Sequence, residues 1–419
     1  MIRTMVVCLG ALVGATSLAS SALAQEWTRF RGPNGTGLSD AAGIPTTWTE
    51  KDYHWKTLLP AGGHSSPVIW KDLVFLTGAN DETGRRFVFA ISTTSGQVVW
   101  TKDYPLAVHR KHKLNSFASP TCAVDDKHVY ASWTTPDEYS VKAFTHDGRE
   151  VWSRSLGPFV SQHSGGVSPI VFDELLIVSN EQDVEGGGQS FLTALDRMTG
   201  EPVWKLERAS DVVTYSTPCV RITPEGKQEL LFNSKSYGIS GIDPLTGKVN
   251  WEVTGLFDKR SCSSSVIAAG DILIGSCGSG GGGNYVVGVI PGTPSDPKSG
   301  KVAYKIDKAA PYVPTPLAKG DLLFLWSDAG IVSCVDGKTG EVYRQKRIGG
   351  TFYGSPICVQ DRLYAINTAG DVVVLAADKD LTELAVNPLG ELCHSTPAVA
   401  DGRLYLRTNE HLISLGGKK

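Results

Sequence analysis

The sequence predicts an all-β protein, an eight-bladed β-propeller of four-stranded antiparallel blades. Three observations lead to this fold class. Gly (46) and Pro (22) together make up 68 of the 419 residues, so turns are frequent and long helices few. A Ser/Thr-Pro pair recurs before short apolar runs, and an Asp-x-x-Thr-Gly turn recurs before an aromatic residue. Units of about 40 to 50 residues with four strands each are typical of propeller blades.

The first half of each unit is an inner strand and the strand that follows it. Seven Ser/Thr-Pro pairs and one Ser-Ser-Ser copy begin the inner strands: Ser66-Pro67, Ser119-Pro120, Ser168-Pro169, Thr217-Pro218, Ser263-Ser264-Ser265, Thr315-Pro316, Ser355-Pro356 and Thr396-Pro397. Successive copies start 40 to 53 residues apart. A second apolar run follows each after a turn, at 73–76, 128–132, 175–179, 230–233, 272–276, 322–326, 362–366 and 403–407.

The second half of each unit is a tight turn between two further strands. The turn begins at Asp196 in residues 194–204, recurs in 241–251, and is present with changes in 90–100, 143–152 and 334–343. Gly supplies a positive φ and Asp bonds back to the backbone, while the terminal aromatic residue packs between blades. The residues expected to dock blades are Trp55, Trp100, Trp152, Asp196, Gly200, Trp204, Asp243, Gly247, Trp251 and Gly340.

The two ends of the repeat region complete one blade. The last unit stops at 412–415 without an aromatic-ended fourth strand, and an orphan strand of that kind stands at 53–58. We expect this N-terminal strand to complete the last blade, because closure removes the open edges of the ring. The propeller then covers residues 53–419, and residues 25–52, with Trp27, Phe30 and Trp48, form an extended arm against it.

Residues 1–24 have the features of a signal peptide. Arg3 precedes a short apolar stretch, and Ala22-Leu23-Ala24 before Gln25 fits a cleavage site. Cys8 lies inside the apolar stretch, so a lipid-anchor signal is missing, and no later apolar run is long enough to span a membrane. We expect an exported, periplasmic or extracellular monomer. Its nearly balanced charge, with 40 Lys and Arg against 43 Asp and Glu, disfavours nucleic acid as a partner.

The Ala-x-Asp-x-x-Thr-Gly-x-x-x-Trp segments resemble the tryptophan-docking repeat of the pyrroloquinoline quinone (PQQ) propeller superfamily, over residues 53 to 416. That superfamily includes eight-bladed quinoprotein alcohol dehydrogenases and BamB-type outer-membrane assembly propellers. Residues 27–35 resemble the opening of exported PQQ-like repeat proteins whose function is generally unassigned. The resemblance implies the fold and leaves the function open, because these residues only dock blades.

Three departures separate the sequence from quinoprotein alcohol dehydrogenases. It has no adjacent Cys-Cys pair and no Cys-x-x-Cys-His, and it is shorter than such enzymes usually are. The compact size and plain blades are closer to the BamB type, from which the missing lipid-anchor signal departs in turn. We therefore expect no cofactor, with PQQ and Ca²⁺ as the alternative.

Residues just before each inner strand are expected to face one end of the central channel. Those positions hold His64, Asn115, Phe117, His163 with Ser164, Tyr215, Arg260, Tyr312, Tyr353 and His394. Such a ring is a plausible pocket for an anionic or aromatic ligand. The same side chains would equally suit the wall of a water-filled channel.

Other candidate sites are weaker. His64 and His394 on adjacent blades could bind zinc or copper, but no local ligand spacing supports this and we predict no metal. Asn180-Glu181 is the one acid-amide pair that could serve Ca²⁺, although a solvated loop is the plainer interpretation. The Gly-rich stretches 185–188 and 278–284 lack the ending of a phosphate-binding loop and are interpreted as turn tips.

Seven cysteines remain after residue 24. Pairing Ile267 with Ile272 would place Cys262 opposite Cys277, where a disulfide could form in an oxidising compartment or both thiols could stay reduced. Cys122, Cys219 and Cys358 lie in inner strands and are expected to be small buried residues.

The sequence as a whole favours an exported, non-catalytic propeller that presents its loop rims to envelope proteins. A PQQ-dependent or PQQ-derived dehydrogenase is the alternative, and a small-ligand or sugar-binding propeller using the channel mouth is a third hypothesis.

Overall fold

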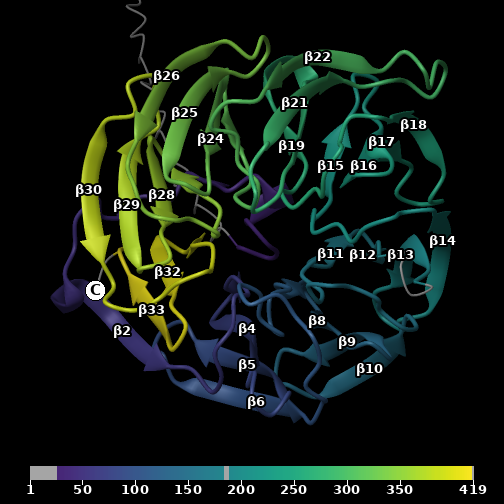
Figure 1. Ribbon diagram of the computed structural model, residues 1–419. Coiled ribbons are helices and arrows are strands. Elements are labelled where there is room, and N and C mark those ends of the chain that lie inside the picture. The colour runs from purple at the N-terminus through teal and green to yellow at the C-terminus, as the bar shows by residue number, and fades with distance from the viewer. Residues whose placement is uncertain (1–25, 184–187, 418–419) are drawn as a thin grey trace, which may run out of the picture.

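Eight antiparallel sheets surround a central channel in the computed structural model, which describes residues 26–183 and 188–417 (Figure 1). The predicted eight-bladed all-β propeller is confirmed. The three short 3-10 helices of the described residues are η1 (Pro33–Gly35), η2 (Glu50–Asp52) and η3 (Ala269–Asp271). No helix in the described ranges is long and apolar enough to cross a membrane. The predicted signal peptide lies outside the described residues.

Each of the first four blades runs from an inner to an outer strand. Their bounds are β3 (Val68–Trp70), β4 (Leu73–Ala79), β5 (Arg86–Ser92) and β6 (Val98–Tyr104); β7 (Ala123–Val124), β8 (His128–Thr134), β9 (Tyr139–Thr145) and β10 (Glu150–Ser155); β11 (Ile170–Phe172), β12 (Leu175–Asn180), β13 (Ser190–Asp196) and β14 (Pro202–Arg208); β15 (Cys219–Ile222), β16 (Gln228–Ser234), β17 (Gly238–Ile242) and β18 (Val249–Val253).

The next three blades repeat this order, and the eighth borrows its outer strand from the N-terminal side. Their bounds are β19 (Val266–Ile267), β20 (Leu273–Cys277), β21 (Tyr285–Ile290) and β22 (Lys301–Ile306); β23 (Leu317–Lys319), β24 (Leu322–Trp326), β25 (Ile331–Asp336) and β26 (Val342–Arg347); β27 (Ile357–Val359), β28 (Arg362–Ile366), β29 (Asp371–Ala376) and β30 (Glu383–Pro388); β31 (Ala398–Ala400), β32 (Arg403–Arg407), β33 (His411–Leu415) and β2 (Tyr53–Leu58).

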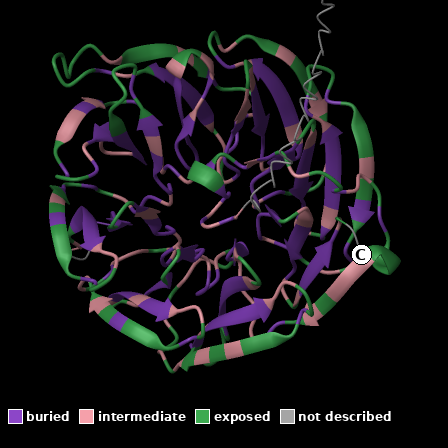
Figure 2. Cartoon of the chain, turned by 180° about the vertical axis from the view of Figure 1, so that it is seen from behind, coloured by how far each residue is buried: buried purple, intermediate pink, exposed green. Residues whose placement is uncertain are grey.

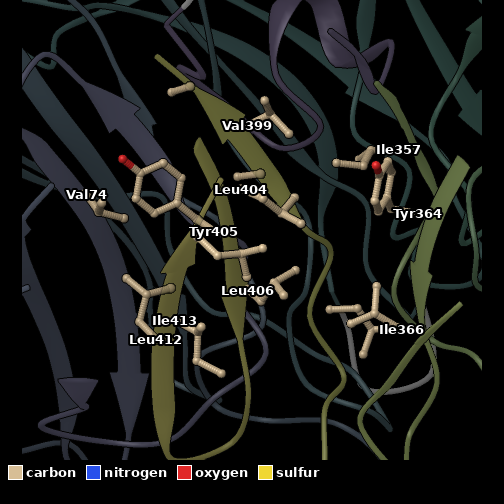
Figure 3. Packing of buried hydrophobic residues seen from close by; sticks show 14 of the residues in the cluster. Val74, Ile357, Tyr364, Ile366, Val399, Leu404, Tyr405, Leu406, Leu412 and Ile413 are labelled. Carbon is tan, nitrogen blue, oxygen red and sulfur yellow. The ribbon is translucent and has the colours of Figure 1, made fainter. Parts of the chain in front are cut away.

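The ring closes through β2, as the orphan strand predicts. This strand pairs antiparallel with β33, with Lys56 opposite Ile413 and Leu58 opposite His411. Blade 8 therefore consists of strands from both ends of the described chain. Its apolar side chains, among them Leu404 and Leu412, pack between blades 7 and 1 (Figure 3).

The recurring turns hold neighbouring blades together. Gly200 has a φ of +73° and lies against the Trp152 ring, so a Cβ there would come within 2.6 Å of the indole. The Trp152 indole N–H also donates to Arg197 O at 3.1 Å. The same two contacts join Trp204 to the turn at Gly247 and Pro244. Each aromatic residue thus docks onto the turn of the following blade.

Trp251 departs from this pattern. Its ring covers Gly241 of its own blade, and its indole N–H donates to Glu229 Oε2 at 3.1 Å. Glu229 is buried and paired with Arg221. The following blade has no Asp-x-x-Thr-Gly turn to receive the indole N–H. The side chain also lies against Gly292 in the connection between β21 and β22, so Trp251 joins blades 4 and 5 although its indole N–H bonds within blade 4.

The N-terminal arm crosses the channel instead of following the outside of the ring. Trp27 bridges to Ile69 in blade 1, and the Asn34 side chain makes two 2.7 Å bonds with the Val220 backbone in blade 4. Strand β1 (Leu38–Ser39) then pairs parallel with β27 as a fifth strand of blade 7. The arm enters the middle of the ring in Figure 1, and a short exposed helix lies over the middle in the reverse view of Figure 2. One end of the channel is therefore covered by the arm.

Candidate functional site

A ring of hydroxyl side chains around the channel explains why Ser or Thr recurs in every blade. In six of the eight blades the backbone N–H at this position donates to the hydroxyl of the next blade, from Ser66 to Thr121 at 2.9 Å and finally from Thr396 back to Ser66 at 3.3 Å. The further bonds of this kind start at Thr121, Ser264, Thr315 and Ser355. In blade 2 the hydroxyl is Thr121, two residues beyond the predicted Ser119.

The open end of the channel holds a cavity of about 690 Å³. Eight of the nine predicted mouth residues line it: His64, Asn115, His163, Tyr215, Arg260, Tyr312, Tyr353 and His394. Its lining also includes Phe30 of the arm, which the sequence interpretation left out of the site. The only sequence feature that could have pointed to Phe30 is its position between two Arg residues, just before Gly-Pro-Asn-Gly.

Phe117, the ninth predicted residue, does not line the cavity. It is buried with Ala79 and Ala118, and the Arg86 guanidinium lies 3.9 Å from the centre of its ring. Asn115 faces the cavity instead, and its amide donates to His163 O at 2.6 Å. The connection into blade 2 is longer than the prediction assumed, so the residue that faces the channel is Asn115, two positions before Phe117.

Three aromatic residues from blades 1, 7 and 8 form a stack in the wall. The His64 and His394 rings are 4.4 Å apart and nearly parallel, and Tyr353 stacks on His394 at 5.7 Å. Burial lowers the pKa of His64 to about 3, so this imidazole is neutral at physiological pH. An imidazole nitrogen binds a metal ion in the plane of its ring. Because the two stacked ring planes are nearly parallel, the geometry disfavours one metal ion bound by both His64 and His394.

Arg260 and His163 form the polar wall between blades 3 and 5. Arg260 Nη1 lies 3.0 Å from His163 Nδ1, and Arg260 Nη2 lies 3.7 Å from Asp183 Oδ1. Burial, with the Arg260 charge next in importance, lowers the pKa of His163 to about 4. Because Nδ1 accepts from the guanidinium, the neutral ring carries its proton on Nε2, where it can donate.

Tyr312 and Asp328 shape the adjoining wall. The Asp328 carboxylate accepts the backbone N–H groups of Tyr312 at 2.7 Å and Val313 at 3.1 Å. Burial raises the pKa of Asp328, although these two bonds oppose the shift. The sequence interpretation did not single out Asp328, which follows the second strand of blade 6 without a motif around it.

The two cysteines of blade 5 are not bonded to each other. Ile267 pairs with Leu273 and not with Ile272, because η3 occupies the turn and shifts the register by one residue. A shift of one residue turns side chains to opposite faces of a sheet. Cys262 accordingly lines the cavity, Cys277 Sγ lies 3.7 Å from Asp258 Oδ1, and both thiols are free. Cys122, Cys219 and Cys358 are buried, as expected.

The predicted calcium candidate is not a solvated loop. Asn180 and Glu181 are buried, the Asn180 side chain accepts from Gln182, and Glu181 pairs with Arg208 at 3.5 Å. In the described ranges, the one group of three potential metal ligands is Glu391, Glu410 and His411. Lys56 already pairs with Glu391 at 2.8 Å, and none of the three lines the cavity.

The Gly-rich stretch at 278–284 borders the mouth of the cavity. Gly280, Gly282 and Gly283 line it, and Lys259 Nζ donates to Gly282 O at 2.8 Å and Gly283 O at 2.9 Å. It connects β20 and β21, as a turn between second and third strands should. Of the other Gly-rich stretch, residues 185–187 lie outside the described part of the chain.

The described cavity residues do not fit a quinone with its Ca²⁺. A Ca²⁺ ion needs six to eight converging oxygen ligands. The two cavity acids are Asp307, which is exposed, and Asp328, which already accepts two backbone N–H groups.

Comparison with solved structures supports the fold. BamB from Moraxella catarrhalis is similar with a TM-score of 0.61 and 13% identity, over 87% of this chain and 98% of that one. Quinohemoprotein alcohol dehydrogenase from Comamonas testosteroni is similar with a TM-score of 0.64 and 14% identity, over 94% and 81%. The related enzyme ADHIIG from Pseudomonas putida HK5 has a TM-score of 0.64 and 12% identity, over 94% and 81%.

The sequence comparisons are more selective. No curated protein matches the sequence. The family model described as outer membrane protein assembly factor BamB matches residues 84–346, which is more than half of the chain. The match runs from the first blade to the sixth, where the docking turns are found. This chain belongs to the family of PQQ-like propellers described by the assembly factor BamB.

Proposed function

We propose that this chain is an exported, non-catalytic binding propeller of the cell envelope, and that the loops around its open channel mouth bind another envelope protein. A set of exposed apolar side chains at this mouth carries the proposal. Leu58, Val108, Leu114 and Leu392 are 66%, 53%, 41% and 58% exposed. Exposed apolar residues that gather around one face are typical of a surface that binds another protein.

Three of these residues belong to connections on the cavity side of the ring, and Leu58 is the last residue of β2 at the same side. Leu114 lines the cavity itself, and Val108 precedes it in the same connection between β6 and β7. Leu392 O accepts from Asn409 N at 2.8 Å, and Leu59, next to Leu58, donates to Glu410 O at 2.8 Å. Both leucines therefore flank the turn between β32 and β33, which follows Arg407.

Charge at the same face indicates the kind of partner. The basic run of residues 110–113 lies in the connection that carries Val108 and Leu114, and Arg110 and Lys113 are exposed. A partner with acidic groups around an apolar patch would complement this surface. The family description, an outer membrane protein assembly factor, supports a protein partner in the envelope. The signal-like segment 1–24 supports export, and a monomeric ring leaves the face free.

Site-specific photo-crosslinking in the source cells tests the partner surface. A benzophenone amino acid at Leu114 should capture an envelope protein, whereas the same probe at Val203, an exposed residue of the outer strand β14, should not. Leu114→Asp should reduce capture by a probe at Val108, and Val203→Asp should leave it unchanged. Capture only from Val203, or from neither position, would contradict the proposal.

Titration of the purified protein with PQQ and Ca²⁺ tests the non-catalytic part. We expect no saturable tryptophan quenching and no dye-linked alcohol oxidation in the same tube. Saturable quenching with turnover would make the chain a reduced quinoprotein dehydrogenase and overturn the proposal.

A further inference from the structure

Three arginines are buried around the channel without an acidic partner. In the described ranges, Arg29, Arg31 and Arg407 have no carboxylate oxygen within 4.0 Å. Their guanidinium groups bind backbone carbonyls instead: Arg29 donates to Pro218 O, Arg31 Nη2 to Pro356 O at 3.4 Å, and Arg407 Nη1 to Ser65 O at 2.9 Å. Burial lowers their pKa to about 10, 9 and 9, so all three remain charged at neutral pH.

Each of these charges lies directly behind the cavity wall. Pro218, Pro356 and Ser65 are sequence neighbours of Thr217, Ser355 and Ser66, which line the cavity. Arg29 and Arg31 also flank Phe30, which lines it too. A buried charge is weakly screened, because little water or salt lies between it and the cavity. The three guanidinium groups therefore contribute positive potential to the cavity, against the carboxylates of Asp307 and Asp328 in its lining.

The wall itself adds one directly accessible cation. Arg260 lines the cavity, and its only carboxylate partner among the described residues is Asp183 at 3.7 Å, longer than a close ion pair. The neighbouring His163 contributes its Nε2–H as a neutral donor. An Arg beside a second N–H donor suits the two oxygens of a carboxylate.

Exposed cations continue this potential to the outside. Arg110 and Lys113 stand in the connection that carries His112, Leu114 and Asn115 into the cavity lining. A mouth of one charge sign with walls of low dielectric constant raises the local concentration of the opposite charge. Cations therefore lie both behind the cavity wall and at its rim.

We propose that the axial cavity is a binding site for a carboxylate ligand, a small organic acid whose carboxylate lies at Arg260 and His163 and whose apolar part lies against Phe30, Val313 and Ile331. A volume of about 690 Å³ is in the range of pockets for small molecules. The site goes beyond the binding of a protein at the rim, and neither requires the other. A carboxylate at the end of a polypeptide would offer the same chemistry.

Calorimetric titration of the mature protein at low salt tests the site with defined probes. Phthalate and citrate are the acids, and dimethyl phthalate is the uncharged analogue. A short peptide with a free C-terminus and its amide distinguish a polypeptide end from a small acid. Arg260→Met removes the proposed contact, and Arg149→Met is the matched control, because Arg149 is exposed and outside the cavity lining.

We expect one acid to bind with one-to-one stoichiometry and its ester not to bind. Arg260→Met should weaken binding by about tenfold or more, and Arg149→Met should leave it unchanged. If Arg260→Met does not fold, the double variant Arg110→Gln/Lys113→Gln should slow association and reduce its salt dependence. Preference for the peptide acid over its amide and over the small acids would keep the carboxylate site and assign it to a polypeptide end.

Two results would overturn the inference. One is the absence of binding by every carboxylate probe at millimolar concentration. The other is equal affinity for phthalate and dimethyl phthalate, or an Arg260→Met variant that binds the acid as well as the wild type does.

Discussion

The two ends of the channel are built from different kinds of structure. At the covered end the arm is held by buried side chains, since Trp27 and Arg31 are fully buried and Asn34 bonds both backbone groups of Val220. At the open end Tyr353 and Leu114 are only partly covered, and their polar and apolar groups face the cavity or its rim. The covered end should therefore contribute to the stability of the ring, and the open end should be free to change with function.

Trp27→Ala should produce the largest loss of stability. The ring is fully buried in the cluster that joins blades 1, 7 and 8, and truncation of a buried Trp costs about 3–5 kcal/mol in unfolding free energy. Urea unfolding measures the effect. A loss below about 1 kcal/mol would mean that the arm is not a fixed part of the fold.

Gly32→Ala should cause the next largest loss of stability, and Gly390→Ala is the comparison. Both glycines have a positive φ, +66° and +74°, and Gly32 also has a ψ of −150°, a combination that is essentially restricted to glycine. A Cβ at Gly32 would also meet the Trp27 ring at 2.4 Å, whereas nothing lies within 4 Å at Gly390. We expect Gly32→Ala to lose about 2 kcal/mol more than Gly390→Ala. Equal losses would show that the arm can move away from the ring.

The open end should make stability depend on pH. The pKa of His64 is about 3 in the folded protein and near 6.5 when unfolded, so the unfolded chain alone binds a proton between these values. Protonation of His64 in the unfolded chain costs no stability above about pH 6.5. As the pH falls below this value, it lowers the unfolding free energy by up to about 2 kcal/mol at pH 5. His64→Asn should remove this contribution from the decline measured by urea unfolding at pH 7 and pH 5, and the contribution of His163, whose pKa is about 4, should remain. An unchanged decline would assign it to other groups.

Leu114→Ser should have the smallest effect. The side chain is exposed at the rim, and substitutions of this kind change stability by less than about 0.5 kcal/mol. A thermal melt beside that of the wild type is sufficient. A clear drop in Tm would mean that the open end also supports the ring, and the contrast between the two ends would disappear.

The sequence predicted those parts of the fold that local chemistry determines. The pattern that contains Asp196 and Gly200 forms the same turn wherever it recurs. The strand at 53–58 belongs to no complete unit, and the last unit lacks a fourth strand, so the two were predicted to pair. The sequence did not predict that the Trp251 indole N–H bonds within its own blade, because this bond depends on a buried pair, Glu229 with Arg221. This arrangement joins residues of β15, β16 and β18, and no local motif in the sequence marks it.

The candidate site was predicted by position, and its errors follow from that. Counting back from each inner strand found His64, Tyr215 and Arg260, since the blades are alike in this respect. Counting misplaced Phe117, because the connection before blade 2 is longer. The assumed hairpin register misplaced Cys277, because η3 shifts the pairing by one residue. Counting could not reach Phe30, because the path of the arm across the channel is set by contacts with four blades and not by a repeat.

Closure of the ring by β2 also sets an order of events in folding. Tyr53 and Leu415, which are paired across the joint, are 362 residues apart in the chain. The first strand of the propeller to be synthesised is therefore the last to find its partner, and until then blade 1 has an open flank. Pairing between distant segments is slow because a long loop must be closed first. The unpaired strand is a target for chaperones and for proteolysis during this interval.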